Sequence, residues 1–244
     1  MSVKLLLHIH TSASKDSILD RWTLLFMCRL RHIDCIAITD HDELRHGLAW
    51  VPFFAAHGIR VIPGEEIFTA EGEIIGLFLC EKIPGGLTPE ETVASIQAQQ
   101  GIVYIPHPYD EKRHRSVLAS AARKRIAESI ELMEVHNGRN GSPAYDVHQR
   151  AICEQMHAVP VIGEDAHCFF EVGRNYMILP SFWDVASFRS AVRHPIEMHA
   201  APCIHVAHLV TKFVHFGKLL RKGDFREIQR ILARKLARRQ PAAR

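Results

Sequence analysis

The 244-residue sequence lacks the features that mark several special classes of protein. It has no uninterrupted run of about 18 apolar residues, so no membrane-spanning helix is expected. Its six cysteines are scattered without a Cys-x-x-Cys pair, which predicts reduced thiols rather than a disulfide framework. No glycine-rich phosphate loop ending in Gly-Lys-Ser/Thr, no internal repeat and no low-complexity linker is present. The apolar run near the N terminus is too short for a signal peptide, and we therefore expect a cytoplasmic protein.

The composition is otherwise that of a globular protein, with 47% hydrophobic and 23% charged residues. Two features depart from the ordinary. Seventeen residues are histidine, and the charge is unevenly distributed. Residues 212–244 hold 11 Lys or Arg against 2 Asp or Glu, whereas the rest of the chain has more acidic than basic residues. Such a basic tail is either a solvated helix face or a surface that contacts nucleic acid.

Short apolar runs alternate with helix-length segments along most of the chain. Several runs are continuous in Val, Ile and Leu, which is typical of strands buried on both faces of a parallel sheet. Helical patterns lie between them, at 17–31, 43–57, 89–100 and 143–157. Repeated strand–helix units with seven strands predict an α/β fold, a closed or nearly closed TIM-like barrel. The seven expected strands are 3–9, 35–39, 59–63, 74–79, 101–106, 129–135 and 159–163.

The pattern changes near residue 200, which predicts two units. Residues 1–200 would form the barrel, and residues 201–244 a basic helical extension with helices at 204–220 and 224–239. We expect the second helix to pack on the barrel or on a partner through its apolar stripe, because five apolar residues fall on one face. These are Phe225, Ile228, Ile231, Leu232 and Leu236.

Histidines and carboxylates follow the carboxyl ends of six expected strands. Because active sites of barrels lie at this end, side chains far apart in sequence are expected to converge there. Imidazole and carboxylate together are the ligands of Zn, Mn or Fe, and eight candidates are enough for two or three divalent ions. We expect Glu65 rather than its neighbour Glu66 to bind, and to be able to bridge two ions. The eight candidates are His8, His10, Asp16, His41, Glu65, His107, Asp165 and His167.

Several of these positions admit a second interpretation. Asp16 binds metal or caps a helix that starts at residue 17. Asp40 and Asp42 flank His41, and each binds metal, orients the imidazole or caps the next helix. Glu134 either belongs to the site or satisfies buried backbone donors.

The expected substrate-binding residues are Asn137, Arg139 and Arg174. The guanidinium fork of the two arginines suits a phosphate group. Lone loop arginines are otherwise usually solvated. His205 and His208 are neighbours on one helix face and define a weaker, separate metal-site hypothesis.

Six segments together resemble the polymerase and histidinol phosphatase (PHP) family, in the order in which that family carries them. They are HIHTSASKD (8–16), ITDHD (38–42), PGEEI (63–67), IPHPYD (105–110), EVHNGRN (134–140) and GEDAHCFFEVG (163–173). The resemblance implies a distorted seven-stranded barrel, a cluster of two or three metal ions and phosphoester hydrolysis by a small stand-alone enzyme. The chain departs from the family at Leu6, where many members have Asp, and at 73–79, which lacks a His that many members carry. His136 is one source of the missing imidazole.

We therefore expect a metal-dependent phosphoesterase that hydrolyses a phosphomonoester, such as a nucleotide, through a metal-activated water. Its expected catalytic residues are His8, His10, Glu65, Asp165 and His167, with Asp165 or His167 handling the proton. The alternatives are an exonuclease acting on nucleic-acid ends and a non-catalytic, metal-stabilised scaffold or nucleic-acid-binding protein. A metal hydrolase of C–N bonds is less favoured, because no expected strand end carries a lysine.

Overall fold

The computed structural model describes residues 1–113, 115–226 and 229–230. Its strands are β1 (Ser2–Ile9), β2 (Cys35–His41), β3 (Arg60–Thr69), β4 (Gly72–Leu77), β5 (Ile102–Ile105), β6 (Leu132–Asn137), β7 (Val159–Ala166), β8 (Tyr176–Pro180) and β9 (Glu197–His199). Its helices are α1 (Arg21–Leu30), α2 (Arg45–Ala49), α3 (Val51–Ala55), α4 (Pro89–Ala98), α5 (Ser120–Arg125), the 3-10 turn η1 (Ala127–Ser129), α6 (Ala144–Gln155), α7 (Val185–Val192) and α8 (His205–Lys222).

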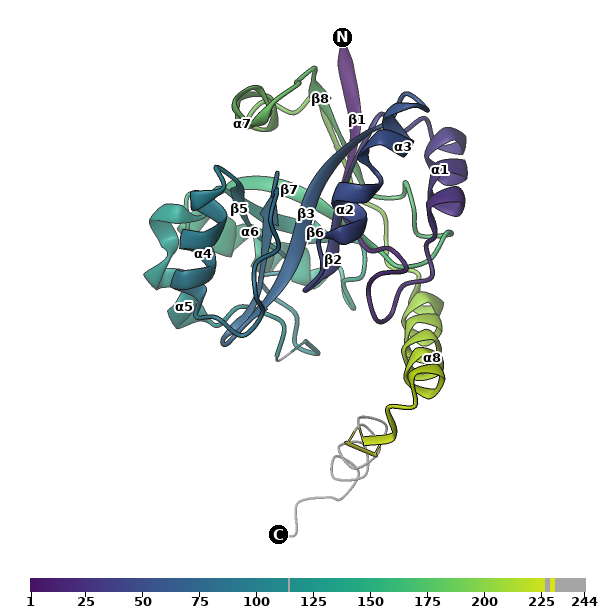
Figure 1. The fold of residues 1–244 in the computed structure, drawn as a ribbon. Coiled ribbons are helices and arrows are strands. Elements are labelled where there is room, and N and C mark those ends of the chain that lie inside the picture. Colours follow the sequence, from purple (N-terminus) through teal and green to yellow (C-terminus); the bar gives the residue numbers. More distant parts are fainter. Residues whose placement is uncertain (114, 227–228, 231–244) are drawn as a thin grey trace.

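A closed seven-stranded barrel forms the body of the molecule, as the sequence predicts. The strands lie in the order β2-β3-β4-β5-β6-β7-β1, and pairing of β1 with β2 closes the ring. β1 pairs with β7 in its second half and with the antiparallel β8 in its first half. All seven expected strands are present, whereas β8 and β9 are two further strands that the apolar pattern missed. The fold is mixed α/β with helices around the barrel (Figure 1).

The expectation of an all-parallel sheet is wrong at β4. This strand runs antiparallel to both β3 and β5, while the remaining neighbours within the ring are parallel. β3 and β4 are joined by a tight connection through Ala70 and Glu71, and so short a link permits only an antiparallel pair. The start of β4, and not its end, therefore lies at the same end of the barrel as the carboxyl ends of the parallel strands.

Local signals explain where the helices begin and end. α4 has the predicted Thr88 cap, and the Glu91 side chain completes a capping box. α1 starts four residues later than predicted, because the Asp20 side chain accepts from the backbone N–H groups of Trp22 and Thr23. The single helix expected at 43–57 is two short helices, since Pro52 stands in the first turn of α3 and cannot donate a backbone hydrogen bond.

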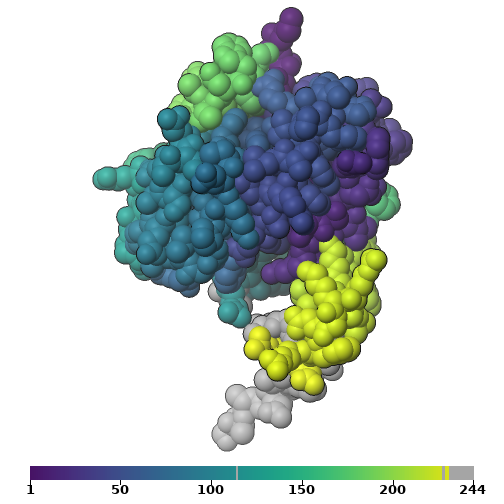
Figure 2. All heavy atoms as spheres, viewed as in Figure 1, coloured from purple at the N-terminus to yellow at the C-terminus, as the bar shows by residue number. Residues whose placement is uncertain are grey.

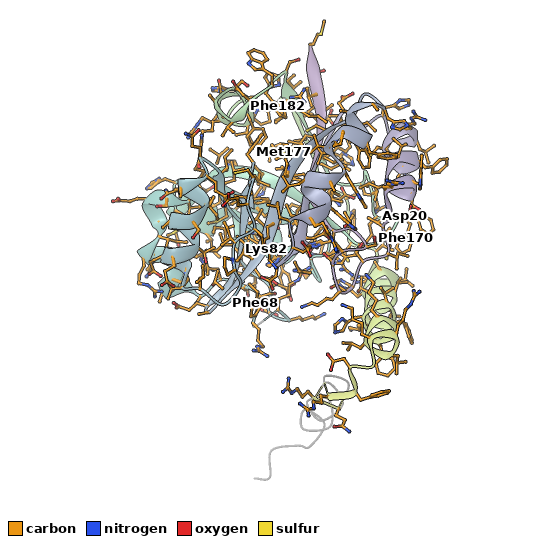
Figure 3. The ribbon with its side chains drawn as sticks, in the orientation of Figure 1. Asp20, Phe68, Lys82, Phe170, Met177 and Phe182 are labelled. Atoms are coloured by element: carbon orange, nitrogen blue, oxygen red, sulfur yellow. The ribbon has the colours of Figure 1, made fainter. Side chains whose placement is uncertain are left out.

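Two hydrophobic clusters lie on opposite faces of the strands. Leu5 and Leu7 of β1 belong to the larger cluster, which also contains Phe182 and Met177. Leu6 points the other way and packs in the second cluster beneath α1 and α3. Figure 3 shows Phe182 and Met177 at the upper end of the barrel and Phe68 at the lower end, where the strands present their carboxyl ends.

The N terminus lies at the upper end of the molecule, and α8 extends from its lower end (Figure 1). No described helix is both long and apolar enough to cross a membrane. The helix expected at 204–220 is α8, whereas most of the one expected at 224–239 lies outside the described residues. The division into a barrel of residues 1–200 and an extension of residues 201–244 stays a prediction.

Candidate metal centre

The lower end of the barrel gathers the histidines and carboxylates singled out from the sequence. They come from the ends of the parallel strands, from the loops that follow, and from the beginning of the reversed strand β4. Three groups of potential ligand atoms each lie within 4.8 Å of one another. These groups are His8–His10–Glu66, His41–Glu66–Glu73 and His10–His41–His167.

The backbone bends at three of these positions. His8, His107 and Asp165 have φ angles of 66°, 28° and 52°, in the left-handed region that most residues avoid. The register of β1 also shifts between Leu6 and Ile9. Bulges next to active sites re-aim side chains, and left-handed residues cost on the order of 1–3 kcal/mol each. Residues in such conformations are frequent at active sites, and three of them lie among the candidate ligands here.

The first group is built around Glu66. Its Oε2 atom lies 3.3 Å from Nε2 of His8 and 3.2 Å from Nε2 of His10. Oδ1 of Asp165 lies 3.8 Å and 3.5 Å from the same two nitrogens. Two imidazole nitrogens and two carboxylate oxygens thus face one point, which is the donor set of a Zn, Mn or Fe site.

Glu134 fixes the orientation of His8 from behind. Its Oε1 is 2.7 Å from Nδ1 of His8 and 2.5 Å from the hydroxyl of Tyr104. Its Oε2 accepts from the backbone N–H of His107 and the side-chain amide of Asn137. With Nδ1–H of His8 donated to this carboxylate, the Nε2 lone pair points at the cluster, the usual arrangement of a metal-bound histidine.

A glycine makes room for this carboxylate. A Cβ atom at Gly163 of β7 would lie 2.0 Å from Oε1 of Glu134. Glu134 is therefore an orienting residue that also satisfies a buried backbone donor, as one interpretation of the sequence proposed.

Glu66 also connects the first group to a second. Its Oε2 lies 3.0 Å from Nδ1 of His41, and its Oε1 lies 3.1 Å from Nε2 of His107. Oxygens of Glu73 lie 3.7 Å from the same His41 nitrogen and 3.4 Å from that of His107. Glu66 therefore lies between the two groups, which is the place where a bridging glutamate is expected.

Asp16 and His167 form the outer side of the cluster. Oδ1 of Asp16 lies 3.4 Å from Nε2 of His167 and 3.8 Å from Nε2 of His41. Because Asp20 caps α1, the Asp16 carboxylate does not serve as that cap and faces the histidines. The ligand interpretation of Asp16 is the one that this geometry favours.

Strong electrostatic coupling pervades the cluster. Burial alone would raise the pKa of Glu66, but His8 and His41 hold it well below the ordinary value. Conversely, burial alone would lower the pKa of His41, and carboxylates led by Glu66 raise it to about 10. His167 differs, because burial and the neighbouring His10 lower its pKa to about 3. Cations bind such sites by replacing the protons on the imidazoles, so metal binding would release protons.

Whether the residues fit metal ions can be judged from their hydrogen bonds. Buried polar atoms in proteins nearly always have a partner. Here several buried atoms that face the cluster make no hydrogen bond of suitable geometry, although other polar atoms of the cluster lie 3.0–3.8 Å away: Nε2 of His8, Nε2 of His10, Oδ1 of Asp16 and Oε2 of Glu66. Orphaned imidazole and carboxylate atoms that converge on shared points fit several divalent metal ions.

The preference for Glu65 over Glu66 is wrong. Adjacent residues of a strand point to opposite faces, and Glu66 is the one that faces the histidines. The Glu65 carboxylate instead accepts a hydrogen bond of 3.0 Å from the backbone N–H of Ile83. Burial raises its pKa to about 7. Glu65 therefore lies outside the three ligand groups.

Other expected residues also lie elsewhere. His136 pairs with Asp146 at 2.8 Å and with Asn175 at 3.1 Å, so it does not supply the imidazole missing from β4. Arg174 donates to the carbonyl of Pro202 and does not line the cleft over the cluster. Asn137 is fully buried and holds Glu134.

The aspartates beside His41 organise loops. Asp40 accepts from the backbone N–H and hydroxyl of Thr11, each at 2.6 Å, and from the hydroxyl of Ser14. Asp42 accepts from the backbone N–H of Phe68. Neither carboxylate belongs to the three ligand groups.

A cleft of about 420 Å³ opens over the cluster. Asp16, His41, Glu73, Asp165 and His167 form part of its wall. Six cationic side chains form much of the remainder: Lys15, Lys112, Arg113, Arg115, Arg139 and Lys212. An electropositive cleft beside a metal cluster attracts anionic ligands and holds them at the ions.

Two arginines of this wall touch the site in different ways. Nη2 of Arg113 donates to Oδ2 of Asp165 at 2.8 Å, so the arginine is held directly against a candidate ligand. Arg139 is buried, with Nη2 donating to Thr211 of α8 and Nε 3.4 Å from Glu171. Arg113 was not predicted from the sequence, although residues 112–115 include three Lys or Arg residues one position beyond the IPHPYD segment. His208 lines the cleft and His205 a separate cavity, and neither belongs to the three ligand groups found among the described residues.

Solved structures with the same fold include three proteins of low sequence identity. PsfC from Pseudomonas syringae PB-5123 has a TM-score of 0.62 at 17% identity, covering 89% of this chain and 98% of that one. A candidate metal-dependent phosphoesterase from Bifidobacterium adolescentis has a TM-score of 0.57 at 14% identity, with 79% and 96% covered. An amidohydrolase from Chromobacterium violaceum, with bound sulfate and no metal, has a TM-score of 0.52 at 15% identity, with 84% and 96% covered.

The chain matches no family model. Two proteins of Methanocaldococcus jannaschii are similar to it in sequence. Uncharacterized protein MJ1587 is 42% identical over 113 residues, which cover 42% of this chain and 66% of that relative. Uncharacterized protein MJ0417 is 33% identical over 177 residues, which cover 72% of this chain and 70% of that relative. The chain therefore belongs to the same protein family as MJ0417 of Methanocaldococcus jannaschii.

Proposed function

We propose that the protein is a metal-dependent phosphoesterase of the PHP type. The observation that carries the proposal is the joint presence of bridged His/carboxylate groups and a cation-lined cleft directly over them. The ligand groups suit two or three ions of Zn, Mn or Fe, and the cations suit the doubly charged phosphate of a monoester. The Bifidobacterium protein has the same barrel fold, which supports the proposal.

The chain's residues divide the work as follows. Glu66 holds the histidine groups together, while Glu134 keeps the Nε2 atom of His8 directed at them. Bound divalent ions would act as Lewis acids and bring the pKa of a coordinated water toward neutrality. Arg113 is placed to offer Nη1 to a phosphate oxygen, because Asp165 holds its Nη2 and Asp110 lies 3.2 Å from its Nε.

His167 has a distinct role in this scheme. Its low pKa keeps the imidazole uncharged at neutral pH, so Nε2 is available to an ion beside Asp16. Its Nδ1 lies 3.0 Å from the backbone carbonyl of Asp165, which fixes the ring. Asp165 therefore links three parts of the site: it faces the Nε2 atoms of His8 and His10 and holds Arg113.

Metal analysis combined with a substrate panel tests the proposal. Purified protein is expected to contain at least two transition-metal ions per chain by plasma mass spectrometry. It should hydrolyse p-nitrophenyl phosphate or a mononucleotide, lose that activity with EDTA and regain it with Zn or Mn. An N-acyl amide in the same panel examines C–N hydrolysis. Full activity without metal, or turnover of the amide alone, would refute the proposal.

A further inference from the structure

The helix α8 is attached to the catalytic end of the barrel by its polar side chains. Nζ of Lys218 donates to the backbone carbonyls of Ser12, Ser14 and Ser17 at 3.0, 2.6 and 2.8 Å. An ammonium group has three protons, so this contact uses all of them. Arg139 reaches Thr211 of α8 from the barrel at 2.9 Å. Figure 2 shows the yellow α8 lying against the purple N-terminal part of the chain.

This attachment makes α8 a wall of two neighbouring cavities. Thr211 and Lys212 line the cleft over the metal cluster. About two to three turns further along, Lys218, Arg221 and Lys222 line a second cavity of about 380 Å³, whose other side is the loop after β1 and the start of α2. Lys15 belongs to the walls of both cavities, so they adjoin at this residue.

The second cavity is strongly cationic. Lys15, Arg45, Lys218, Arg221 and Lys222 contribute five positive charges to its wall. Among the described residues that line it, none carries a carboxylate.

Acidic groups outside the wall act on part of this charge, since Asp16 and Asp40 both attract the ammonium group of Lys218. Asp40 lies buried beneath the loop and is bonded to Thr11 and Ser14. Glu43 reaches Arg45 only at 3.9 Å. Cations clustered in one cavity wall repel one another, and a bound polyanion relieves that repulsion.

We propose that this second cavity is a subsite for a phosphate group of the substrate that lies beyond the phosphate held at the metal cluster. The inference rests on the proposed phosphoesterase function and narrows its substrate class. A substrate that fills both cavities carries phosphate groups in series, as a short single-stranded oligonucleotide with a terminal phosphate does. Arg45, Arg221 and Lys222 would hold its internal phosphodiester, while Lys15 spans the two subsites.

A pair of charge-removing variants tests the subsite in the full chain. Arg221→Gln/Lys222→Gln removes two cations from the second cavity, and Lys124→Gln/Arg193→Gln removes two exposed cations from α5 and the end of α7. The first pair is expected to lower kcat/KM for both substrates, but by a factor at least ten times larger for a 5′-phosphorylated tetranucleotide than for p-nitrophenyl phosphate. The slope of log(kcat/KM) against log salt should flatten by about 1.4, since each phosphate contact to a single strand contributes about 0.7. The control pair should change neither the ratio of the two kcat/KM values nor the slope of log(kcat/KM) against log salt.

A second variant makes the result independent of the folding of α8. Arg45 lines the same cavity from α2. Arg45→Gln should therefore also lower the ratio of kcat/KM for the tetranucleotide to kcat/KM for p-nitrophenyl phosphate. Equal losses on both substrates, or the same loss in the control pair, would overturn the subsite.

Anisotropy with a fluorescent phosphorothioate tetranucleotide separates the two proposals. Binding that weakens in the Arg221/Lys222 variant while no substrate is hydrolysed would sustain the subsite and reject the phosphoesterase. Turnover of p-nitrophenyl phosphate by the wild type, with tetranucleotide binding unchanged in the Arg221/Lys222 variant, would sustain the phosphoesterase and reject the subsite.

Discussion

Replacing Glu66 by glutamine perturbs the centre of the proposed metal cluster. The glutamine has the same shape but lacks the charge and has only one acceptor oxygen. In the structure the two carboxylate oxygens lie 3.0–3.3 Å from nitrogens of His8, His10, His41 and His107. A neutral amide at this point cannot bridge two ions, and its NH₂ group faces imidazole nitrogens that should bind metal. We expect Glu66→Gln to lose metal and activity together.

The size of the effect follows from ligand loss. Changing a group that merely supports a ligand typically costs 10–100-fold in metal affinity, so loss of a bridging ligand should cost at least about 100-fold. That factor corresponds to about 2.7 kcal/mol. At a metal concentration of about 100 times the wild-type dissociation constant, bound metal stabilises the folded wild-type protein by a similar free energy, and the variant loses most of that stabilisation. For a chain of this size the melting temperature in the presence of metal should fall by roughly 5–11 °C.

Glu65→Gln is the matched control, because the two residues are neighbours with the same side chain. Its amide oxygen can still accept from the backbone N–H of Ile83, and it resembles the protonated form that a pKa of about 7 makes accessible. Metal stoichiometry, melting temperature with and without EDTA, and kcat/KM are measured for both variants. Retention of metal and activity in Glu66→Gln, with their loss in Glu65→Gln, would refute the assignment of the bridging carboxylate.

Three further predictions concern other parts of the molecule. Arg113→Lys keeps the charge but loses the guanidinium group held by Asp165, and should raise KM for p-nitrophenyl phosphate about tenfold. Arg174→Lys is the control and should leave this KM unchanged. Equal effects of the two substitutions would show that Arg113 does not bind the substrate. Truncation after Gly223 removes seven of the tail's cations but none of the ligand groups, so turnover of p-nitrophenyl phosphate should survive while nucleic-acid affinity and its salt dependence decrease. Hydrogen bonds, led by that from the Thr23 hydroxyl, lower the pKa of Asp20 below its ordinary value of 3.8. The stabilisation of the folded state by this carboxylate is therefore present above pH 3.8 and is lost as the pH falls through the lowered pKa. In urea unfolding, Asp20→Ala should lower the free energy of unfolding by about 1 kcal/mol at pH 7, and by less at pH 3.

The barrel was predictable because its strands carry continuous apolar runs. Strands such as β1 and β2 are buried on both faces, and both sets of alternating side chains are accordingly apolar. The direction of β4 carries no comparable signal, since an apolar run has no polarity along the chain. Glu73 was missed for that reason: it stands at the start of its strand, where a search of strand ends does not look.

The choice between Glu65 and Glu66 depended on register. In the parallel pair β2–β3, Asp40 is the partner of Glu65 and His41 is the partner of Glu66. Paired residues on neighbouring strands project to the same face, so a ligand role for His41 implies one for Glu66. The sequence shows two adjacent glutamates and says nothing about which of them pairs with His41. A shift of one residue exchanges the two faces, which is why this error was possible.

Three positions of the site have backbone conformations that local sequence patterns do not predict. His8, His107 and Asp165 have left-handed backbones, and a bulge interrupts β1 where His8 turns toward Glu66. Such conformations persist only where the surroundings hold them. Here Glu134 anchors both the His8 side chain and the His107 backbone, and Arg113 anchors Asp165. Removing Glu134 should therefore release two strained ligands at once, so its importance to metal binding exceeds what its position behind the cluster suggests.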